Sequence, residues 1–378
     1  MSGEKLWHAP PPCKVGAIIQ EIDTPALVVD VDKLESNLQK MGQLMRKFAG
    51  VKVRPHAKAH KCPDIGKMQV DHGAVGLCCQ TLVEAEAMVY NGHVPDVLVS
   101  NQLIGEAKLR RLAALANHAK VSICVDDPGN VQEISQVARD SGVTIECVVE
   151  VNVGQDRCGV EPEDTARIAE EVLKHPNITF KGIQCYQGWN QHVRKHSDRK
   201  AAVDIVINKS KVALKALQDK GIECNYVTGG GTGTFPFEAS SGVFTEVQPG
   251  SYIFMDADYG RNFGEDGGYF TDFEHSLLVL TTVQSVTEGN RAVVDAGMKA
   301  VSMDSGVPLV QKHSDVTYHI GGDEHGILRP QGSFKVGELV WLVPGHCDPT
   351  VNLYNWIIGL RGDRVEALWP VSGRGPGV

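Results

Sequence analysis

The sequence predicts an α/β protein in which a (β/α)8 barrel is followed by a mainly β domain. Two observations predict it: strand-like apolar runs alternate with amphipathic helical segments over 24–264, and after about residue 265 strand-like runs follow one another with turn residues between them. Regular strand–helix alternation is typical of a parallel sheet with helical crossovers. We therefore expect an N-terminal segment (1–23) packed with the β domain, a barrel (24–264) and a β domain (265–378).

The first strand–helix unit illustrates the pattern. Residues 24–30 form a continuous apolar run, which is typical of a fully buried strand. Asp32 and Glu35 have the spacing of a capping box at the start of the next helix. An apolar face then follows at helical spacing, formed by Leu34, Leu38, Met41, Met45 and Phe48.

The unit repeats along the chain. Further strands are predicted at 51–54, 74–79, 97–100, 121–125, 145–151, 180–186, 226–228 and 251–255, with helices at 63–72, 82–90, 106–117, 130–139, 162–174 and 200–220. With the first run this gives nine strands, whereas eight close such a barrel, so we expect one end member to lie outside it. The β domain is predicted to contain strands at 277–283, 291–294, 338–343, 356–360 and 364–368.

The composition is ordinary for a soluble globular enzyme. Of the 378 residues, 42% are hydrophobic and 22% charged, and the formal net charge is −9. This acidic excess argues against a nucleic-acid partner, because phosphate binding needs a basic surface. Residues 1–7 lack the apolar run of a secretory signal, and no run of about 18 apolar residues could span a membrane, so we expect a cytoplasmic protein. The ten cysteines lack C-x-x-C spacing and are expected to be reduced.

A dense basic cluster follows the predicted strand at 51–54. The strand stops at a proline, and His56, Lys58, His60 and Lys61 come directly after it. In a barrel the active site is built at the C-terminal ends of the strands. Neighbouring cations would depress the pKa of Lys58, which is the state that a Schiff-base lysine needs. The alternative is a solvated basic turn.

A glycine run follows the eighth predicted strand run. Thr228, Gly229, Gly230 and Gly231 let backbone N–H groups converge on an anion, and barrels commonly bind phosphate in the loops after strands seven and eight. The run does not match a dinucleotide or nucleoside-triphosphate motif, and its alternative is a flexible turn. A phosphate site combined with an activated lysine suggests pyridoxal 5'-phosphate.

Two other predicted strands end in polar residues. Arg157 follows the run at 145–151 and could bind a cofactor ring, or it could form a surface salt bridge. After the run at 180–186, Tyr186 could stack on a ring and His192 could act as an acid or base, although an isolated histidine is more often structural.

The last cluster lies in the β domain at 344–350. In an extended segment His346 and Asp348 would point to the same side while Cys347 faces away. A histidine with a carboxylate suits a divalent ion such as Mn²⁺ or Zn²⁺. A polar turn is the alternative.

Taken together, the motifs at 23–27, 55–61, 228–234 and 344–348 resemble the D-threonine aldolase and D-serine dehydratase family of pyridoxal-phosphate enzymes, which have the alanine-racemase-type fold (fold type III). The resemblance covers nearly the whole chain and implies a homodimer. It implies that Lys58 forms the Schiff base, that Arg157 and Tyr186 lie beside the cofactor ring and that 228–231 bind its phosphate. It also implies His346 and Asp348 as ligands of a divalent metal, Mn²⁺ first, with Mg²⁺, Zn²⁺ or Co²⁺ as alternatives. Ser251 and Tyr252 are further candidate cofactor contacts.

Within this family, dehydratase members tend to carry His-x-Cys and aldolase members His-x-Asp, so Asp348 favours an aldolase. We expect cleavage of D-threonine and other D-3-hydroxy-amino acids to glycine and an aldehyde, with His192 taking the hydroxyl proton. The alternatives are a D-serine or D-3-hydroxyaspartate dehydratase and a non-catalytic cofactor-binding protein of the same barrel type. Lys299, Glu324 and His325 receive no role from the sequence.

Overall fold

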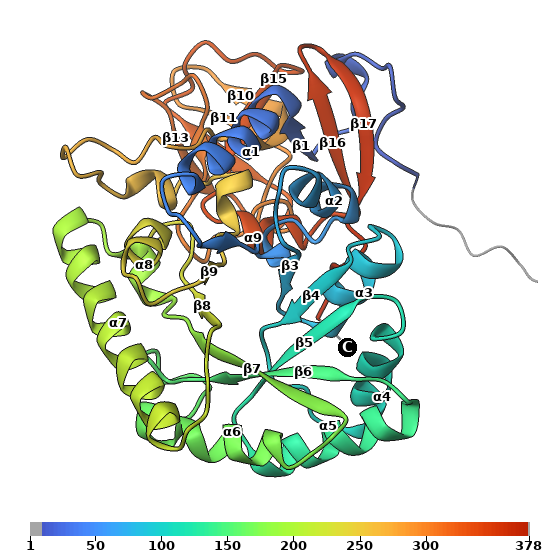
Figure 1. The fold of residues 1–378 in the computed structure, drawn as a ribbon. Helices are drawn as coiled ribbons and strands as arrows, with labels where there is room; N and C mark the ends of the chain where they lie inside the picture. Colours follow the sequence, from blue (N-terminus) through green and yellow to red (C-terminus); the bar gives the residue numbers. More distant parts are fainter. Residues whose placement is uncertain (1–9, 377–378) are drawn as a thin grey trace, which may run out of the picture.

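The computed structural model describes residues 10–376 as two sheets, one above the other in Figure 1. The lower part is an eight-stranded sheet in which every neighbouring pair is parallel, and helices cover its outside. The upper part is a nine-stranded, mostly antiparallel sheet in the order β11-β14-β13-β12-β15-β10-β1-β16-β17. The architecture confirms the prediction of a parallel barrel with a separate β domain.

The barrel is curled so that its first and last strands meet. Its strands are β2 (Lys52–Val53), β3 (Leu77–Cys79), β4 (Asp96–Val99), β5 (Lys120–Val125), β6 (Ile145–Glu150), β7 (Ile178–Cys185), β8 (Val227–Gly229) and β9 (Glu246–Val247). They follow the order β2-β9-β8-β7-β6-β5-β4-β3, and a parallel bridge between His56 and Cys78 joins the two ends.

Helices connect successive barrel strands. They are α2 (Pro63–Asp71), α3 (Leu82–Tyr90), α4 (Glu106–Leu115), α5 (Pro128–Ser141), α6 (Thr165–Leu173), α7 (His196–Asp219) and α8 (Phe235–Ser240). The sequence of α5 shows why such a segment is helical. The side chain of Asp127 caps the first turn by accepting from the Asn130 amide, Pro128 occupies the first turn, and Gly142 ends the helix at a left-handed φ of 66°.

The nine-stranded sheet is formed mainly by the C-terminal part of the chain. Besides β1 (Ala26–Asp30) it contains β10 (Leu277–Thr287), β11 (Arg291–Val294), β12 (Leu309–Val310), β13 (Thr317–Ile320), β14 (Gly326–Arg329), β15 (Leu339–Val343), β16 (Trp356–Arg361) and β17 (Arg364–Pro370). The helices α1 (Val31–Met45) and α9 (Cys347–Val351) complete this part. Apolar side chains of α1 and of this sheet share one hydrophobic core.

Two end strands of the prediction lie outside the barrel, whereas only one was expected. The run at 24–30 is β1, which pairs with β10 and β16 in the nine-stranded sheet. A continuous apolar run indicates a strand buried on both faces but does not indicate which sheet receives it. The run at 251–255 is not a strand, because Ser251–Ile253 forms the 3-10 helix η5. The eighth barrel strand is instead β9, whose two residues are too few to show a pattern.

The start of α1 also differs from the prediction. Asp30, and not Asp32, caps this helix, since the Asp30 carboxylate accepts from the Lys33 amide at 3.2 Å. The predicted apolar face is correct at Leu34 and Met41, which are fully or almost fully buried. The cap lies two residues earlier because β1 leads directly into the helix, so that the last residue of the strand, Asp30, is also the N-cap.

The described part of the N-terminal segment packs on the nine-stranded sheet. Ile22 is buried in one apolar cluster with Val28 and Ile358, and Ile18 forms an antiparallel bridge with Arg364. Residues 1–9, which include the region predicted to lack a secretory signal, lie outside the described residues.

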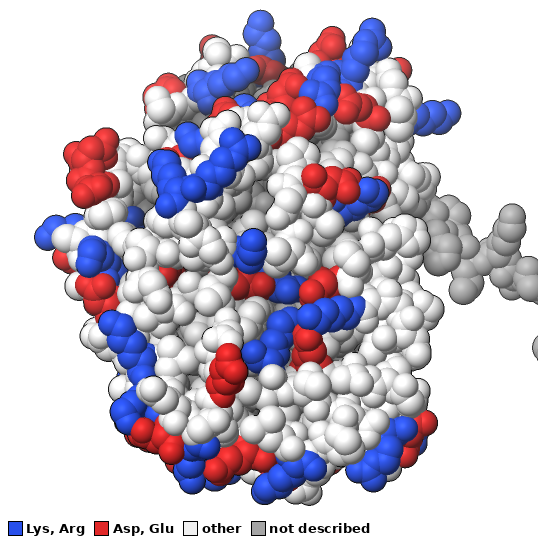
Figure 2. All heavy atoms as spheres, viewed as in Figure 1, with Lys and Arg blue, Asp and Glu red and all other residues white. Residues whose placement is uncertain are grey.

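Two surface properties bear on the partners. Within the described part of the chain, none of the helices has the length and apolarity needed to cross a membrane. On the face shown in Figure 2, acidic and basic side chains are interspersed.

All ten cysteines are free, and most of them are buried, in agreement with the expected reduced state.

Candidate active site

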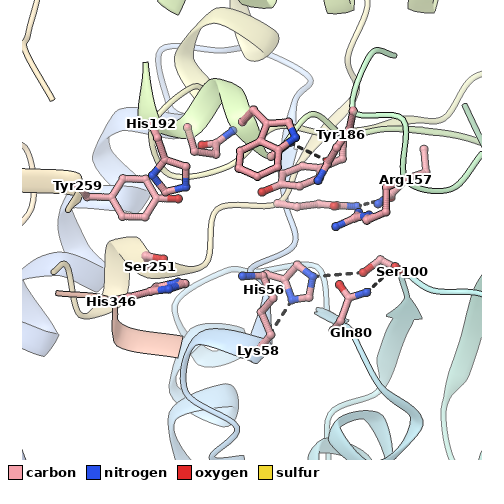
Figure 3. A pocket seen from close by; sticks show the side chains of 16 residues that line it. His56, Lys58, Gln80, Ser100, Arg157, Tyr186, His192, Ser251, Tyr259 and His346 are labelled. Carbon is pink, nitrogen blue, oxygen red and sulfur yellow. Dashed lines mark hydrogen bonds between the residues drawn. The ribbon is translucent and has the colours of Figure 1, made fainter. Parts of the chain in front are cut away.

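A pocket of about 210 Å³ lies at the C-terminal ends of the barrel strands, where the barrel meets the loop that precedes α9. In Figure 3, Arg157, Tyr186 and His192 are on one side of it, and His56, Lys58 and His346 are on the opposite side. Six of the predicted site residues line this pocket, namely Lys58, Arg157, Tyr186, His192, Ser251 and His346.

The barrel explains how these side chains converge. His56 follows β2, Ser100 follows β4, and Gln184 is the penultimate residue of β7. All three therefore project from the same edge of the sheet. His56 Nε2 lies 3.2 Å from Ser100 Oγ. Burial lowers the pKa of His56 well below its usual value, and the nearby Lys58 adds to this effect, so His56 is a neutral hydrogen-bonding group in the pocket wall.

Lys58 lies on the 3-10 helix η2 (Ala57–Ala59), which packs against α9. Its ammonium group forms an ion pair with the carboxylate of Asp348 on α9. Burial by itself would lower the pKa of Lys58, but the Asp348 carboxylate outweighs burial and raises the pKa above its usual value. The predicted depression of this pKa is therefore wrong for the protein in this state, because the fold brings an anion from the other domain that the local sequence does not contain.

The two remaining members of the basic cluster serve the structure around Lys58. His60 is fully buried, its Nε2 lies 3.1 Å from Gln69 Oε1, and burial lowers its pKa to about 4. Lys61 Nζ donates to the backbone carbonyl oxygens of Lys58 and Asp348 at 2.6 and 3.3 Å. Lys61 thus ties η2 to α9, which fixes the position of Lys58.

Arg157 and Tyr186 form a flat polar wall opposite Lys58. The Arg157 guanidinium carbon lies 5.9 Å from the centre of the Tyr186 ring. Its Nη2 is 3.9 Å from Glu150 Oε1, so this residue makes both the ion pair and the pocket contact that the sequence offered as alternatives.

The glycine run is a tight turn beside the pocket. A Cβ atom on Gly229 would come within 2.1 Å of the Cys185 carbonyl oxygen, and one on Gly231 within 2.6 Å of Gln191 Oε1. The backbone therefore lies closer to its neighbours than any other residue type would permit. The Thr228 hydroxyl is buried and donates to Glu246 Oε1, so it faces the barrel interior.

The two candidates on η5 are placed differently. Ser251 lines the pocket, whereas the Tyr252 ring is 2% exposed and packs in the apolar core, with its hydroxyl accepting from Gln69 Nε2 at 3.2 Å. Only the backbone of Tyr252 reaches the glycine run, where its N–H donates to Thr232 Oγ1 at 3.0 Å. Its side chain therefore lies outside the pocket wall.

His192 stands on the 3-10 helix η4 (Trp189–His192) and faces the pocket. Its Nδ1 lies 2.5 Å from Asp258 Oδ2, and its ring is tilted against the Tyr259 ring with 5.8 Å between their centres. Asp258 also forms an ion pair with Arg194. Sequence reasoning missed Asp258 and Tyr259, because they lie in an irregular segment without periodicity.

The predicted metal pair is close together, but for a different reason than the one expected. His346 is extended, whereas α9 begins at Cys347, so the segment at 344–350 is not a continuous strand. His346 Nε2 is nevertheless 3.9 Å from Asp348 Oδ2, because the first turn of α9 folds the carboxylate back. On its other side, His346 Nδ1 lies 2.7 Å from Asp304 Oδ2. Across residues 10–376, no group of three or more His, Cys, Asp or Glu side chains has the arrangement of a metal site.

The residues without a predicted role lie elsewhere. Lys299 and Glu324 form an exposed ion pair on the β domain, with 2.6 Å between Nζ and Oε1, and His325 is exposed beside them. Several glutamines of the pocket were also missed, among them Gln80, Gln184 and Gln248. A polar residue at the end of an apolar strand run was the signal that could have indicated Gln80 and Gln184.

An eight-stranded parallel barrel with a lysine at its strand ends, closed by a separate β domain, defines a protein of the alanine-racemase type. Comparison with known families agrees. Residues 29–258 match the alanine racemase N-terminal domain, and residues 276–360 match the putative serine dehydratase domain. The chain therefore belongs to the alanine-racemase-type family, which implies pyridoxal phosphate as cofactor.

Relatives cover nearly the full length of the chain. The 3-hydroxy-D-aspartate aldolase of Paracoccus denitrificans (strain Pd 1222) is 45% identical over 97% of this chain and 96% of the relative. The D-threonine aldolase of Arthrobacter sp. is 40% identical, with the same shares covered. The crystal structure of D-threonine aldolase from Filomicrobium marinum superimposes with a TM-score of 0.92 at 43% identity and covers 96% of this chain and 99% of that chain. These relatives are lyases, and the chain is an enzyme of this class.

Proposed function

We propose that the chain is a metal-dependent aldolase that cleaves D-threonine and related D-3-hydroxy-amino acids to glycine and an aldehyde. The observation that carries the proposal is the placement of His192 and His346 around one pocket with Lys58, each histidine with its Nδ1 on a carboxylate. The similarity to two kinds of D-3-hydroxy-amino-acid aldolase supports it. The relative called D-threo-3-hydroxyaspartate dehydratase, from Delftia sp., is only 28% identical.

The pocket fits pyridoxal phosphate. Lys58 offers an amine on one side, and the Arg157 and Tyr186 wall faces it across the pocket. The glycine run lies next to η5, which carries Ser251, since the Tyr252 N–H donates to Thr232 Oγ1 at 3.0 Å. In this proposal Lys58 binds the cofactor covalently, Arg157 and Tyr186 hold its ring, and the backbone of 228–231 with Ser251 holds its phosphate. When bound, the cofactor supplies an electron sink for the negative charge that develops at Cα.

The donor set also fits a divalent metal. His346 Nε2 and an Asp348 oxygen lie close enough to share one ion, and the Asp304 carboxylate beside Nδ1 leaves Nε2 as the free ligand atom. A nitrogen and a carboxylate oxygen suit Mn²⁺, with Mg²⁺, Zn²⁺ or Co²⁺ as alternatives. An ion held there supplies Lewis-acid polarisation of the substrate's 3-hydroxyl.

The chemistry then needs one base from the chain. His192 accepts the proton of the 3-hydroxyl as the Cα–Cβ bond breaks. The electron pair of that bond goes to Cα, C3 becomes the aldehyde carbon, and Cα takes up a proton to give glycine. Lys61 holds Lys58 and Asp348 in a fixed position relative to each other during turnover, because its ammonium group donates to the backbone carbonyl oxygens of both residues.

The position of Cys347 favours cleavage over dehydration in this proposal. Its side chain is fully buried, and its Sγ lies 3.2 Å from Asp348 Oδ1. Burial raises the pKa of the thiol well above its usual value, and the Asp348 charge adds to this. The thiol thus lies against the carboxylate of Asp348. The proposal takes Asp348 as the second ligand, which gives the His-x-Asp set expected for the aldolase branch.

The test is to incubate the purified holoenzyme with D-threonine and, separately, with 3-hydroxy-D-aspartate, and to assay glycine and the 2-oxo acid. We expect glycine together with an aldehyde from D-threonine. A predominance of 2-oxobutanoate would instead establish a dehydratase. Activity should disappear after EDTA treatment and return with Mn²⁺, whereas full activity in EDTA would refute the metal role.

We also propose a homodimer, which the fold type implies, with the pocket completed between barrel and β domain. Sedimentation equilibrium should give twice the mass of 40.9 kDa. A monomeric mass at full activity would contradict this part of the proposal.

A further inference from the structure

His192 is held by a carboxylate that lies behind its ring. The side chain of His192 is 40% exposed and lines the pocket, whereas that of Asp258 is 7% exposed. Asp258 Oδ2 lies 2.5 Å from His192 Nδ1. The Nε2 atom is thus the ring nitrogen left for the pocket.

Asp258 is itself immobilised from several directions. Arg194 pairs with its second carboxylate oxygen and donates from Nη1 to its backbone oxygen at 2.7 Å. Burial would raise the pKa of Asp258, but the hydrogen bonds from His192 and Arg194 outweigh it and lower the pKa to about 2. The carboxylate is therefore ionised at any working pH, and as a pure acceptor it requires a proton on His192 Nδ1.

The backbone of Asp258 also reaches the other wall of the pocket. Its N–H donates to the Gly345 carbonyl oxygen at 3.2 Å, and the N–H of Ala257 donates to Pro344 at 2.9 Å. Gly345 immediately precedes His346. One segment therefore sets the distance between His192 and the loop that carries His346.

We propose that Asp258 is a positioning residue that holds His192 in the Nδ1–H form, so that Nε2 is the proton acceptor for the substrate's 3-hydroxyl. This inference rests on the proposed function, in which His192 is the base. A histidine whose Nδ1–H is bonded to a carboxylate has its orientation and its tautomer fixed together. An asparagine at this position would present an amide N–H to Nδ1 or rotate away, and the tautomer would no longer be enforced.

The first experiment is a double-mutant cycle on the holoenzyme. Asp258→Asn should reduce kcat for aldehyde release by about 10²–10⁴-fold, the range for losing a properly oriented general base, with KM and the cofactor absorbance unchanged. In the His192→Ala background the same substitution should have no further effect, since Asp258 acts through the ring. Asp272→Asn, the same change on an exposed residue of a neighbouring loop, is the matched control and should retain wild-type kcat.

An equal loss in both backgrounds would assign Asp258 a purely structural role and overturn the proposal, as would a kcat for Asp258→Asn within about twofold of wild type. Wild-type activity in His192→Ala alone would instead refute the proposed base. The two failures are thus distinguishable.

The second measurement does not depend on activity. Nitrogen NMR of ¹⁵N-histidine-labelled holoenzyme reports which ring nitrogen carries the proton. We expect His192, assigned from its absence in the spectrum of His192→Ala, to be protonated on Nδ1 in the wild type. A proton on Nε2 with Nδ1 unprotonated would overturn the inference.

Discussion

Glu238 is buried beneath the glycine run without a full set of partners. Its side chain is 3% exposed, and Oε1 accepts from Thr234 Oγ1 at 2.9 Å. Among the described residues, Oε2 is buried without a hydrogen-bond partner. Burial raises the pKa of this carboxyl from 4.5 to about 7. We predict that Glu238→Gln stabilises the protein in alkaline solution.

The magnitude follows from linkage. A tenfold change in proton affinity is worth about 1.4 kcal/mol, so the rise in pKa corresponds to about 3 kcal/mol. Because the pKa of this acid is higher in the folded state, the folded protein binds more protons, and the free energy of unfolding falls as the pH rises from 4.5 through about 7. The penalty is complete above that pH. Glutamine has nearly the same shape and cannot ionise, so it removes the penalty.

The assay is urea unfolding followed by tryptophan fluorescence at pH 5 and at pH 8.5. The free energy of unfolding of Glu238→Gln, relative to wild type, should be about 3 kcal/mol higher at pH 8.5 than at pH 5. Glu133→Gln, on the exposed face of α5, should show the same difference from wild type at both pH values. A pH-independent difference for Glu238→Gln would refute the claim that this carboxyl is buried with a raised pKa.

Three further predictions follow from the site. Lys58→Ala should abolish both the absorbance of the bound cofactor and cleavage, measured by spectrophotometry and glycine release; retention of both would refute its role. Gly229→Ala should lower the free energy of unfolding by about 1–3 kcal/mol, because its Cβ would lie 2.1 Å from the Cys185 carbonyl oxygen. The control, Gly42→Ala, lies in α1 with open space around it and should raise the free energy of unfolding by about 0.5–1 kcal/mol in the same urea assay. Cys347→Ala should leave the Mn²⁺ affinity of the holoenzyme unchanged in calorimetry, and a large loss would identify sulfur as a ligand.

Sequence reasoning located the pocket where chain order and spatial order coincide. Lys58 follows β2, Arg157 follows β6, and Tyr186 and His192 both follow β7. Parallel strands end at a common edge, so the meeting of these residues in one pocket follows from the fold. The same reasoning could not find β9, since a two-residue strand has no period. It also failed on the pKa of Lys58, because the deciding charge comes from the other domain.

The segment at 256–258 shows what kind of information a local pattern lacks. Its two carboxylates have different partners: Asp256 accepts from the first amide of α9, that of Cys347, at 3.0 Å, and Asp258 binds His192. Neither contact is visible in the sequence, because each depends on a loop that the fold alone brings near. The two contacts act on different parts of the site: the Asp256 carboxylate holds the start of α9, which carries Asp348, and the Asp258 carboxylate holds the imidazole of the proposed base. A substitution of Asp256 should therefore disturb metal binding, and a substitution of Asp258 should disturb proton transfer, although neither side chain belongs to a recognisable catalytic motif.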